Sequence, residues 1–165
     1  MSHAARRIPR RNGFTLIELL IVVAITVIVG VVAIVDISQR RVDTDLTSTA
    51  QEIATTLRQA QSDSMAVEGG TAWGVHFANS TATAPFYALF SGASYATGTV
   101  EGYYRLPSTV AYQPATLASG ATLDVLFSAV SGAAAPSATI GLYMPNESAA
   151  FSSTITVSPA GGVSY

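Results

Sequence analysis

Residues 10–25 read Arg-Arg-Asn-Gly-Phe-Thr-Leu-Ile-Glu-Leu-Leu-Ile-Val-Val-Ala-Ile, and this stretch decides how the rest of the chain is organised. It joins a basic cluster and a glycine to an apolar run over residues 14–35, in which only two threonines and Glu18 are polar. Roughly 20 apolar residues suffice for a helix to cross a bilayer, so the run predicts a membrane-spanning helix over residues 14–35. Glu18 needs a separate explanation, because a charge near the membrane centre costs about 2.5–3.5 kcal/mol on insertion scales.

The distribution of charge predicts which side of a membrane each part of the chain occupies. All eight basic residues are arginines, and four of them precede Phe14. Basic residues favour retention in the cytoplasm, so residues 1–13 are expected to be a cytoplasmic leader and residues 36–165 an exported head. Arg40 and Arg41 oppose this orientation but are fewer. Removing the leader leaves four arginines against ten acids, a balance of −6, which argues against nucleic acid as a partner.

Three interpretations of the apolar run compete. A cleaved secretory signal has an apolar core of about 7–15 residues followed by a small-residue site, and this run is longer and contains an acid. A plain signal anchor explains the length and the arginines, but it explains neither the Gly13–Phe14 junction nor Glu18. The third interpretation depends on a resemblance.

Residues 11–19, Arg-Asn-Gly-Phe-Thr-Leu-Ile-Glu-Leu, resemble the class III signal of type IV pilins and of the pseudopilins of type II secretion systems. The resemblance implies that a prepilin peptidase cuts between Gly13 and Phe14 and that Phe14 is then N-methylated. It also implies that Glu18 acts in filament assembly by pairing with the N-terminal amine of a neighbouring subunit. A buried cation is what makes an acid tolerable in an apolar environment.

The same resemblance implies a location and a set of partners. The protein would be a single-pass protein of the cytoplasmic (inner) membrane, with its N-terminus inside and its head outside, and later part of a periplasmic or extracellular filament. The implied partners are other pilin or pseudopilin subunits, the prepilin peptidase, an inner-membrane assembly platform, and the lipid bilayer before assembly.

The helix is expected to continue beyond the apolar run. No proline lies between Pro9 and Pro85, and small or apolar residues recur at alternating steps of four and three, as on one face of a helix. Gly69-Gly70 is expected to end it, so the prediction is one helix from Phe14 to Val67. The members of this stripe are Leu46, Ala50, Ile53, Leu57, Ala60, Ser64 and Val67.

Beyond residue 70 the pattern changes to strands of period two, separated by Ala/Ser/Gly/Pro loops. A strand region of this size does not readily bury a large core alone, and the helical stripe supplies the missing face. The predicted fold is therefore α+β and pilin-like: a long N-terminal helix, amphipathic to about residue 68, packed on an antiparallel β-sheet head. The expected strands are 71–78 (half-buried), 86–90, 102–106, 123–127, 140–142, 155–157 and 163–165.

A second resemblance concerns the subfamily. Residues 53–67 followed by Gly-Gly, and the C-terminal stretch 155–163, are similar to minor pilins and pseudopilins of the GspH/FimT type. Some FimT-like proteins capture DNA through arginines near the C-terminus, but this chain has none after Arg105. Gly161-Gly162 stands where the subfamily often has Gly-Arg. The expected role is a minor structural subunit. The alternatives are a major pilin, a DNA-binding minor pilin for natural transformation, and an anchored β-domain that does not assemble.

The sequence contains no recognisable set of catalytic residues, so the chain is not expected to be an enzyme. The chain contains no cysteine and two histidines, His3 in the leader and His76 on an expected strand. No transition-metal site and no cofactor are therefore expected. His76 is expected to be a surface or hydrogen-bonded histidine with no ligand to hold.

Overall fold

A computed structural model describes residues 14–145 and 152–165. Its elements are helix α1 (Leu16–Met65), a short 3-10 helix η1 (Glu68–Gly70) and nine strands. The chain divides into two compact units, Met1–Arg40 and Arg41–Tyr165. The predicted leader, residues 1–13, lies outside the described residues. The strands are β1 (Trp73–Ala78), β2 (Phe86–Ser91), β3 (Thr99–Arg105), β4 (Ala111–Tyr112), β5 (Thr122–Phe127), β6 (Ala134–Ala135), β7 (Ala138–Tyr143), β8 (Ser152–Val157) and β9 (Val163–Ser164).

The second half of α1 is amphipathic, as its sequence predicts. Six members of the predicted stripe are buried, and each is at most 5 % exposed. The seventh, Val67, is 38 % exposed, so its assignment to the buried stripe was wrong. The reason is that α1 ends at Met65, and Val67 already has left-handed backbone torsions with a φ of 52°. The helix stops two residues before its predicted end, and Gly69 and Gly70 complete the turn.

The strands form two antiparallel sheets where the sequence predicted a single one. The first sheet has the order β3-β2-β1-β5-β6, and the second has the order β4-β7-β8-β9. Every pairing is antiparallel, so the predicted α+β class with antiparallel strands is confirmed. All seven predicted strands are present, while the two-residue strands β4 and β6 were missed because two residues show no periodicity.

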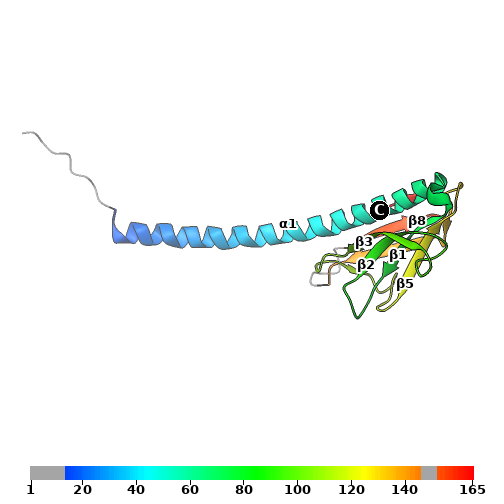
Figure 1. Ribbon diagram of the computed structural model, residues 1–165. Helices are drawn as coiled ribbons and strands as arrows, with labels where there is room; N and C mark the ends of the chain where they lie inside the picture. Colours follow the sequence, from blue (N-terminus) through cyan, green and yellow to red (C-terminus); the bar gives the residue numbers. More distant parts are fainter. Residues whose placement is uncertain (1–13, 146–151) are drawn as a thin grey trace, which may run out of the picture. The chain divides into compact units, whose positions relative to one another are not determined.

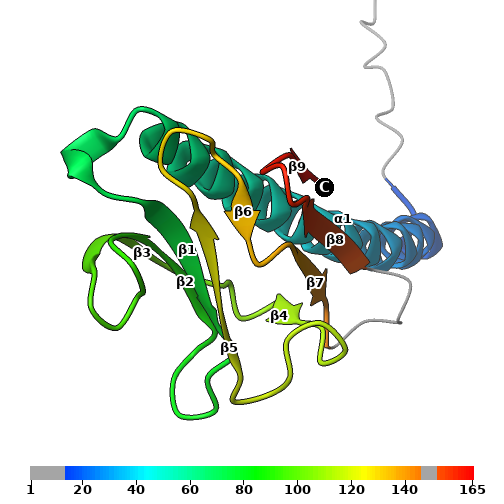
Figure 2. The ribbon, with the colours of Figure 1, turned by 90° about the vertical axis from the view of Figure 1, so that its right-hand side faces the viewer.

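One core lies between α1 and the two sheets. Figures 1 and 2 show the strands arranged along the second half of α1. Ile53, Leu57 and Ala60 of the helix are completely buried, as are Val75 and Phe77 on β1. The second sheet contributes buried apolar side chains from its own strands, namely Tyr112, Ile140, Leu142, Ile155 and Val157. The helix thus supplies the face that the strands lack, as the sequence predicts.

Strand β1 is buried on both faces, so the prediction that it is half-buried was wrong. Residues 74–78 are all buried, including His76 at 7 % exposure. The outer face is covered because residue 95, in the loop between β2 and β3, lies over it: the ring of Tyr95 stacks on that of His76 at 3.9 Å. A lone period-two pattern does not reveal a loop that folds back onto the sheet.

Ser64 joins the end of the helix to the first sheet. Its buried Oγ accepts a hydrogen bond from the Trp73 amide at 2.7 Å and donates to the Phe127 carbonyl at 2.9 Å. Arg58, six residues earlier, donates to the Val163 carbonyl at 3.1 Å, and its guanidinium lies 5.5 Å from the centre of the Tyr165 ring. These contacts fix the helix against β1, β5 and the C-terminal strand.

Candidate functional site

The first turn of α1 is built around a threonine. Phe14 and Thr15 precede the helix, which begins at Leu16. The Thr15 Oγ1 accepts a hydrogen bond from the Glu18 amide at 3.3 Å, and the Thr15 carbonyl accepts one from the Leu19 amide at 3.2 Å. Thr15 therefore caps the helix and satisfies an amide that would otherwise have no partner. This role was not predicted, although a threonine three residues before a glutamate and an apolar run is the signature of a capping box.

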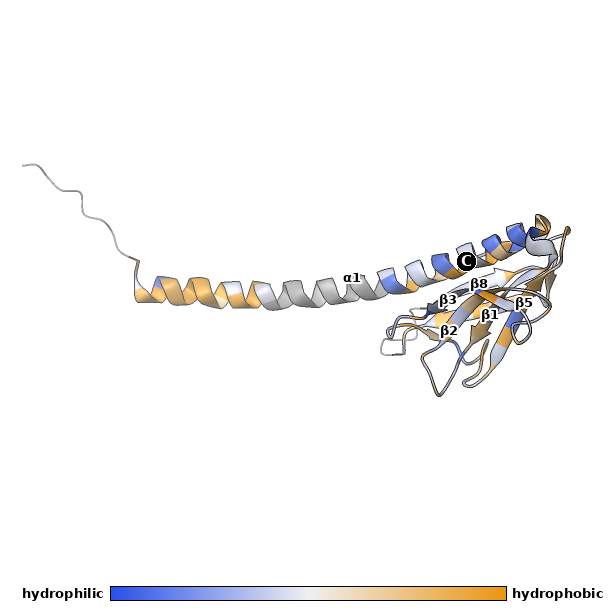
Figure 3. Ribbon diagram, in the orientation of Figure 1, coloured by the Kyte–Doolittle hydropathy of each residue, from blue (hydrophilic) through white to orange (hydrophobic). Residues whose placement is uncertain are grey.

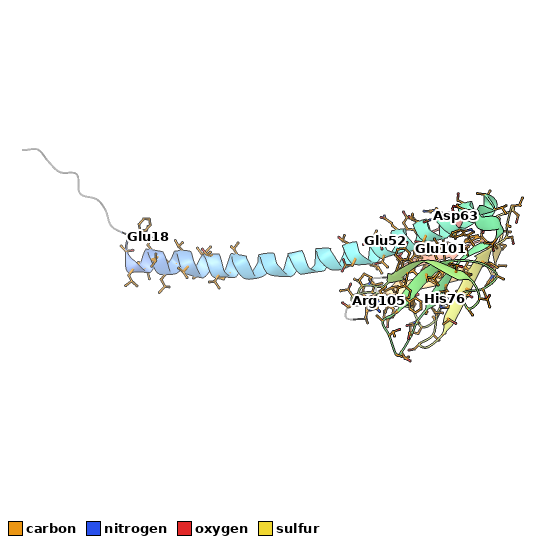
Figure 4. All side chains as sticks on the ribbon, viewed as in Figure 1. Glu18, Glu52, Asp63, His76, Glu101 and Arg105 are labelled. Carbon is orange, nitrogen blue, oxygen red and sulfur yellow. The ribbon has the colours of Figure 1, made fainter. Side chains whose placement is uncertain are left out.

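Glu18 lies in this first turn and is exposed (Figure 4). The N-terminal end of a helix favours a negative charge, because the free amides and the aligned peptide dipoles give it a partial positive charge. The helix end therefore stabilises the carboxylate locally. The partial charge of a helix end is about half an elementary charge, so it is less than a full counter-charge.

The side chains around Glu18 form an apolar surface on every side of the helix. The large apolar residues from Phe14 to Val29 are between 51 % and 83 % exposed, and Figure 3 shows mainly hydrophobic colouring over the start of α1. A helix that is apolar all round is normally buried in a protein or a membrane. A shallow apolar groove of about 420 Å³ lies on this surface, lined by Leu16, Leu19, Leu20, Val23 and Ala24.

Among the described residues 19–30, one side chain carries a hydroxyl, and this hydroxyl is hydrogen-bonded within the helix. Thr26 donates its Oγ1 proton to the Val22 carbonyl at 2.7 Å. This local bond removes the need for water at that hydroxyl. The first part of α1 can therefore enter an apolar environment with Glu18 as its one ionisable group among the described residues 14–30.

The structure places two of the three predicted site residues. Phe14 and Glu18 lie at the two ends of the capped first turn, and Phe14 is 83 % exposed. Gly13 lies outside the described residues. The cleavage, the methylation and the assembly role of these residues stay predictions.

Within the described residues, no helix is both long enough and apolar enough to cross a membrane. The membrane span predicted for residues 14–35 stays a prediction.

His76 is the described residue that most resembles a catalytic group. Its Nδ1 lies 2.5 Å from a carboxylate oxygen of Asp124, whose other oxygen accepts a hydrogen bond from the Tyr95 amide at 3.3 Å. The ring is covered by Tyr95 and lies 5.7 Å from that of Phe86. The histidine is therefore hydrogen-bonded, which is one of the two predicted states, but it is buried under Tyr95, which was not predicted. Among the described residues, no group of three His, Cys, Asp or Glu side chains is placed to hold a metal ion.

The comparison with known families concerns the start of the chain. The prokaryotic N-terminal methylation motif matches residues 8–34, a segment that contains Gly13, Phe14 and Glu18. Comparisons with curated proteins and with solved structures gave no match.

Proposed function

We propose that this chain, whose methylation motif indicates a prepilin-like type IV pilin or pseudopilin subunit, is a minor structural subunit of the GspH/FimT type. It would be cut after Gly13, N-methylated at Phe14 and assembled into a type IV pilus or a type II secretion pseudopilus. The observation that carries the proposal is the motif match over residues 8–34, because the predicted cleavage bond and the predicted assembly acid both lie inside it.

In this proposal the start of α1 has two successive environments. Residues 14–35 first span the cytoplasmic membrane, with the N-terminus inside and the head outside. After cleavage they leave the bilayer and pack against the same helices of neighbouring subunits. Two features support this sequence of events: the exposed apolar surface around Glu18, and the internally satisfied hydroxyl of Thr26. Repeated head-to-tail contacts between identical or related surfaces do not close, so they produce a fibre.

Glu18 would direct the assembly step. A carboxylate that moves from an interface into packed apolar helices is strongly destabilised unless a cation meets it. Cleavage creates such a cation, the methylated amine of Phe14. Each subunit would then offer one amine, at Phe14, and one acid, Glu18. The two charges would neutralise each other only when a neighbouring subunit places its amine beside the acid.

The experiment that tests this proposal compares assembly of matched variants. Glu18→Ala should insert and be cleaved but should be absent from sheared filaments, while Glu68→Ala, an exposed acid beyond the helix, should be incorporated normally. Gly13→Leu should block cleavage. Normal incorporation of Glu18→Ala would refute the charge-pairing step.

The same preparation separates the minor role from that of a major pilin. A minor subunit is rare relative to the main filament protein, and a major pilin dominates it, so quantitative mass spectrometry of sheared filaments decides between them. The third candidate, an anchored domain that does not assemble, predicts no chain in the filaments. A DNA-binding role predicts salt-sensitive retention of duplex DNA by the full chain. The proposal is of a structural subunit with no catalytic activity.

A further inference from the structure

An open groove lies beside the helix in the unit Arg41–Tyr165. Its volume is about 600 Å³, within the range of about 300–1,000 Å³ typical of small-molecule sites. One wall is the exposed flank of α1, and the other is formed by tyrosines of β2 and β3. The lining residues are Ser48, Gln51, Glu52, Thr55, Thr56, Gln59, Tyr87 and Tyr104.

The two tyrosines form an aromatic platform. Tyr87 and Tyr104 face each other across the β2–β3 pair, and their rings stack with centroids 5.1 Å apart and planes 20° apart. Tyr87 is only 2 % exposed, whereas Tyr104 is 43 % exposed. The Tyr104 ring also lies over Gly102, where an added Cβ would come within 2.8 Å of the phenol oxygen. Gly102 thus leaves room for Tyr104 to lie flat against the strand with part of its surface open to the groove.

The helix wall is polar and almost uncharged. Ser48, Gln51, Thr55 and Gln59 recur at steps of three and four, so they follow one flank of α1. The glutamines offer amide donors and acceptors, whereas Ser48 and Thr55 donate their hydroxyl protons to helix carbonyls, which leaves their oxygens as acceptors. Glu52, which Figure 4 labels on the second half of α1, is the acidic residue among those that line the groove. Burial raises the pKa of Tyr87, and the nearby Glu52 carboxylate raises it further. The Tyr87 phenol is therefore a neutral hydrogen-bonding group beside that carboxylate.

The charges exclude anionic ligands. None of the eight lining residues is basic, and the sequence of the whole unit, residues 41–165, carries three arginines against eight acids, a balance of −5. Nucleic acid binding requires cations to neutralise phosphates, and this groove offers a carboxylate where they would be needed.

The adjacent sheet edge is protected against addition of a peptide strand. β3 is the outer strand of its sheet, and its register with β2 shifts between Leu89 and Phe90. Its exposed residues include Glu101 and Arg105. Bulges and charged side chains are the devices that prevent edge strands from pairing with another chain. These features disfavour an extended peptide as the occupant.

We propose that this groove binds a neutral saccharide. A sugar ring has an apolar face of C–H groups, which packs on an aromatic ring, and a rim of hydroxyls, which needs both donors and acceptors. Tyr104 supplies the ring, the amides of Gln51 and Gln59 supply donors and acceptors, and the carboxylate of Glu52 supplies a strong acceptor. The site would give the head a binding activity of its own, separate from assembly of the helix.

The test uses the full chain in a detergent without a sugar headgroup, with cellobiose, maltose and N,N′-diacetylchitobiose as probes. Ligand-observed NMR and calorimetry should detect binding of at least one of them. Tyr104→Ala should weaken that binding by about tenfold or more. Tyr103→Ala is the matched control, because Tyr103 is on the same strand with 46 % exposure but pairs with Ala88 on the opposite face of the sheet.

Glu52→Gln provides a second variant, since it changes an exposed side chain and should leave the melting temperature unaltered while weakening the same probe. No binding by any of the three probes would overturn the proposal. Equal losses in Tyr104→Ala and Tyr103→Ala would overturn it as well. Binding of duplex DNA or of a peptide that depends on Tyr104, without binding of the saccharides, would assign the groove to another class of ligand.

Discussion

Replacing Ser64 by alanine tests how the helix is attached to the first sheet. The side chain is completely buried, and its Oγ bonds both to the Trp73 amide at 2.7 Å and to the Phe127 carbonyl at 2.9 Å. Alanine removes both bonds and leaves the Trp73 amide without its partner. An unsatisfied buried group costs about 1–3 kcal/mol, and the better helix propensity of alanine returns about 0.5 kcal/mol.

The expected net loss is therefore about 1–2 kcal/mol of the free energy of unfolding, or about 4–8 °C in melting temperature for a unit of this size. Urea unfolding followed by tryptophan fluorescence is the direct assay. Trp73 is the single tryptophan of the chain, so the signal comes from the site itself. Amide hydrogen exchange at Trp73 should accelerate in the same variant.

The matched control is Ser62→Ala, two residues earlier on the exposed side of the same helix. It should change the free energy of unfolding by less than about 0.5 kcal/mol. If Ser64→Ala were no more destabilising than Ser62→Ala, the assignment of Ser64 as the link between α1, β1 and β5 would be wrong.

Two further predictions concern the core. Burial raises the pKa of Tyr87 and of Tyr112. Because the unfolded phenols ionise at lower pH than the folded ones, the contribution of these phenols to the free energy of unfolding is fully present below about pH 10. Above that pH the free energy of unfolding falls by up to about 1.4 kcal/mol per pH unit for each phenol. Urea titrations from pH 8 to 12 should show this slope, and it should become shallower in Tyr87→Phe; an unchanged slope would contradict it. Gly74→Ala should destabilise the head by about 1–3 kcal/mol, because a Cβ there would meet the Val125 carbonyl at 2.7 Å and the Phe90 ring at 2.8 Å. Circular dichroism melts would measure the loss, and a melting temperature equal to that of the unmodified chain would show that the Val125 carbonyl and the Phe90 ring both move aside at no cost.

The sequence predicts most of the secondary structure because both periodicities are strong. The stripe from Leu46 to Ser64 repeats at helical spacing and is buried as expected. The longer strands alternate at period two, and each was found within a few residues of its predicted limits. Of the candidate site, the motif around Gly13, Phe14 and Glu18 could be read directly, because it is a local pattern, and the family model matches the same segment.

The remaining features depend on contacts between residues far apart in the chain. The division into two sheets follows from which strands pair, and period-two alternation does not specify a partner. The covering of His76 by Tyr95 requires a loop to return over the sheet. The proposed saccharide groove is lined by both Glu52 and Tyr104, which are 52 positions apart in the sequence. The cap at Thr15 differs, because its Thr-x-x-Glu pattern is local and can be read from the sequence.

The central claim is that the chain is processed as a prepilin, and mass spectrometry of the protein from sheared filaments tests it most directly. The account predicts an N-terminal peptide that begins at Phe14 and carries one methyl group on its amine, with no trace of residues 1–13. A filament-associated chain that begins at Met1, or one cut at any bond other than Gly13–Phe14, would contradict it.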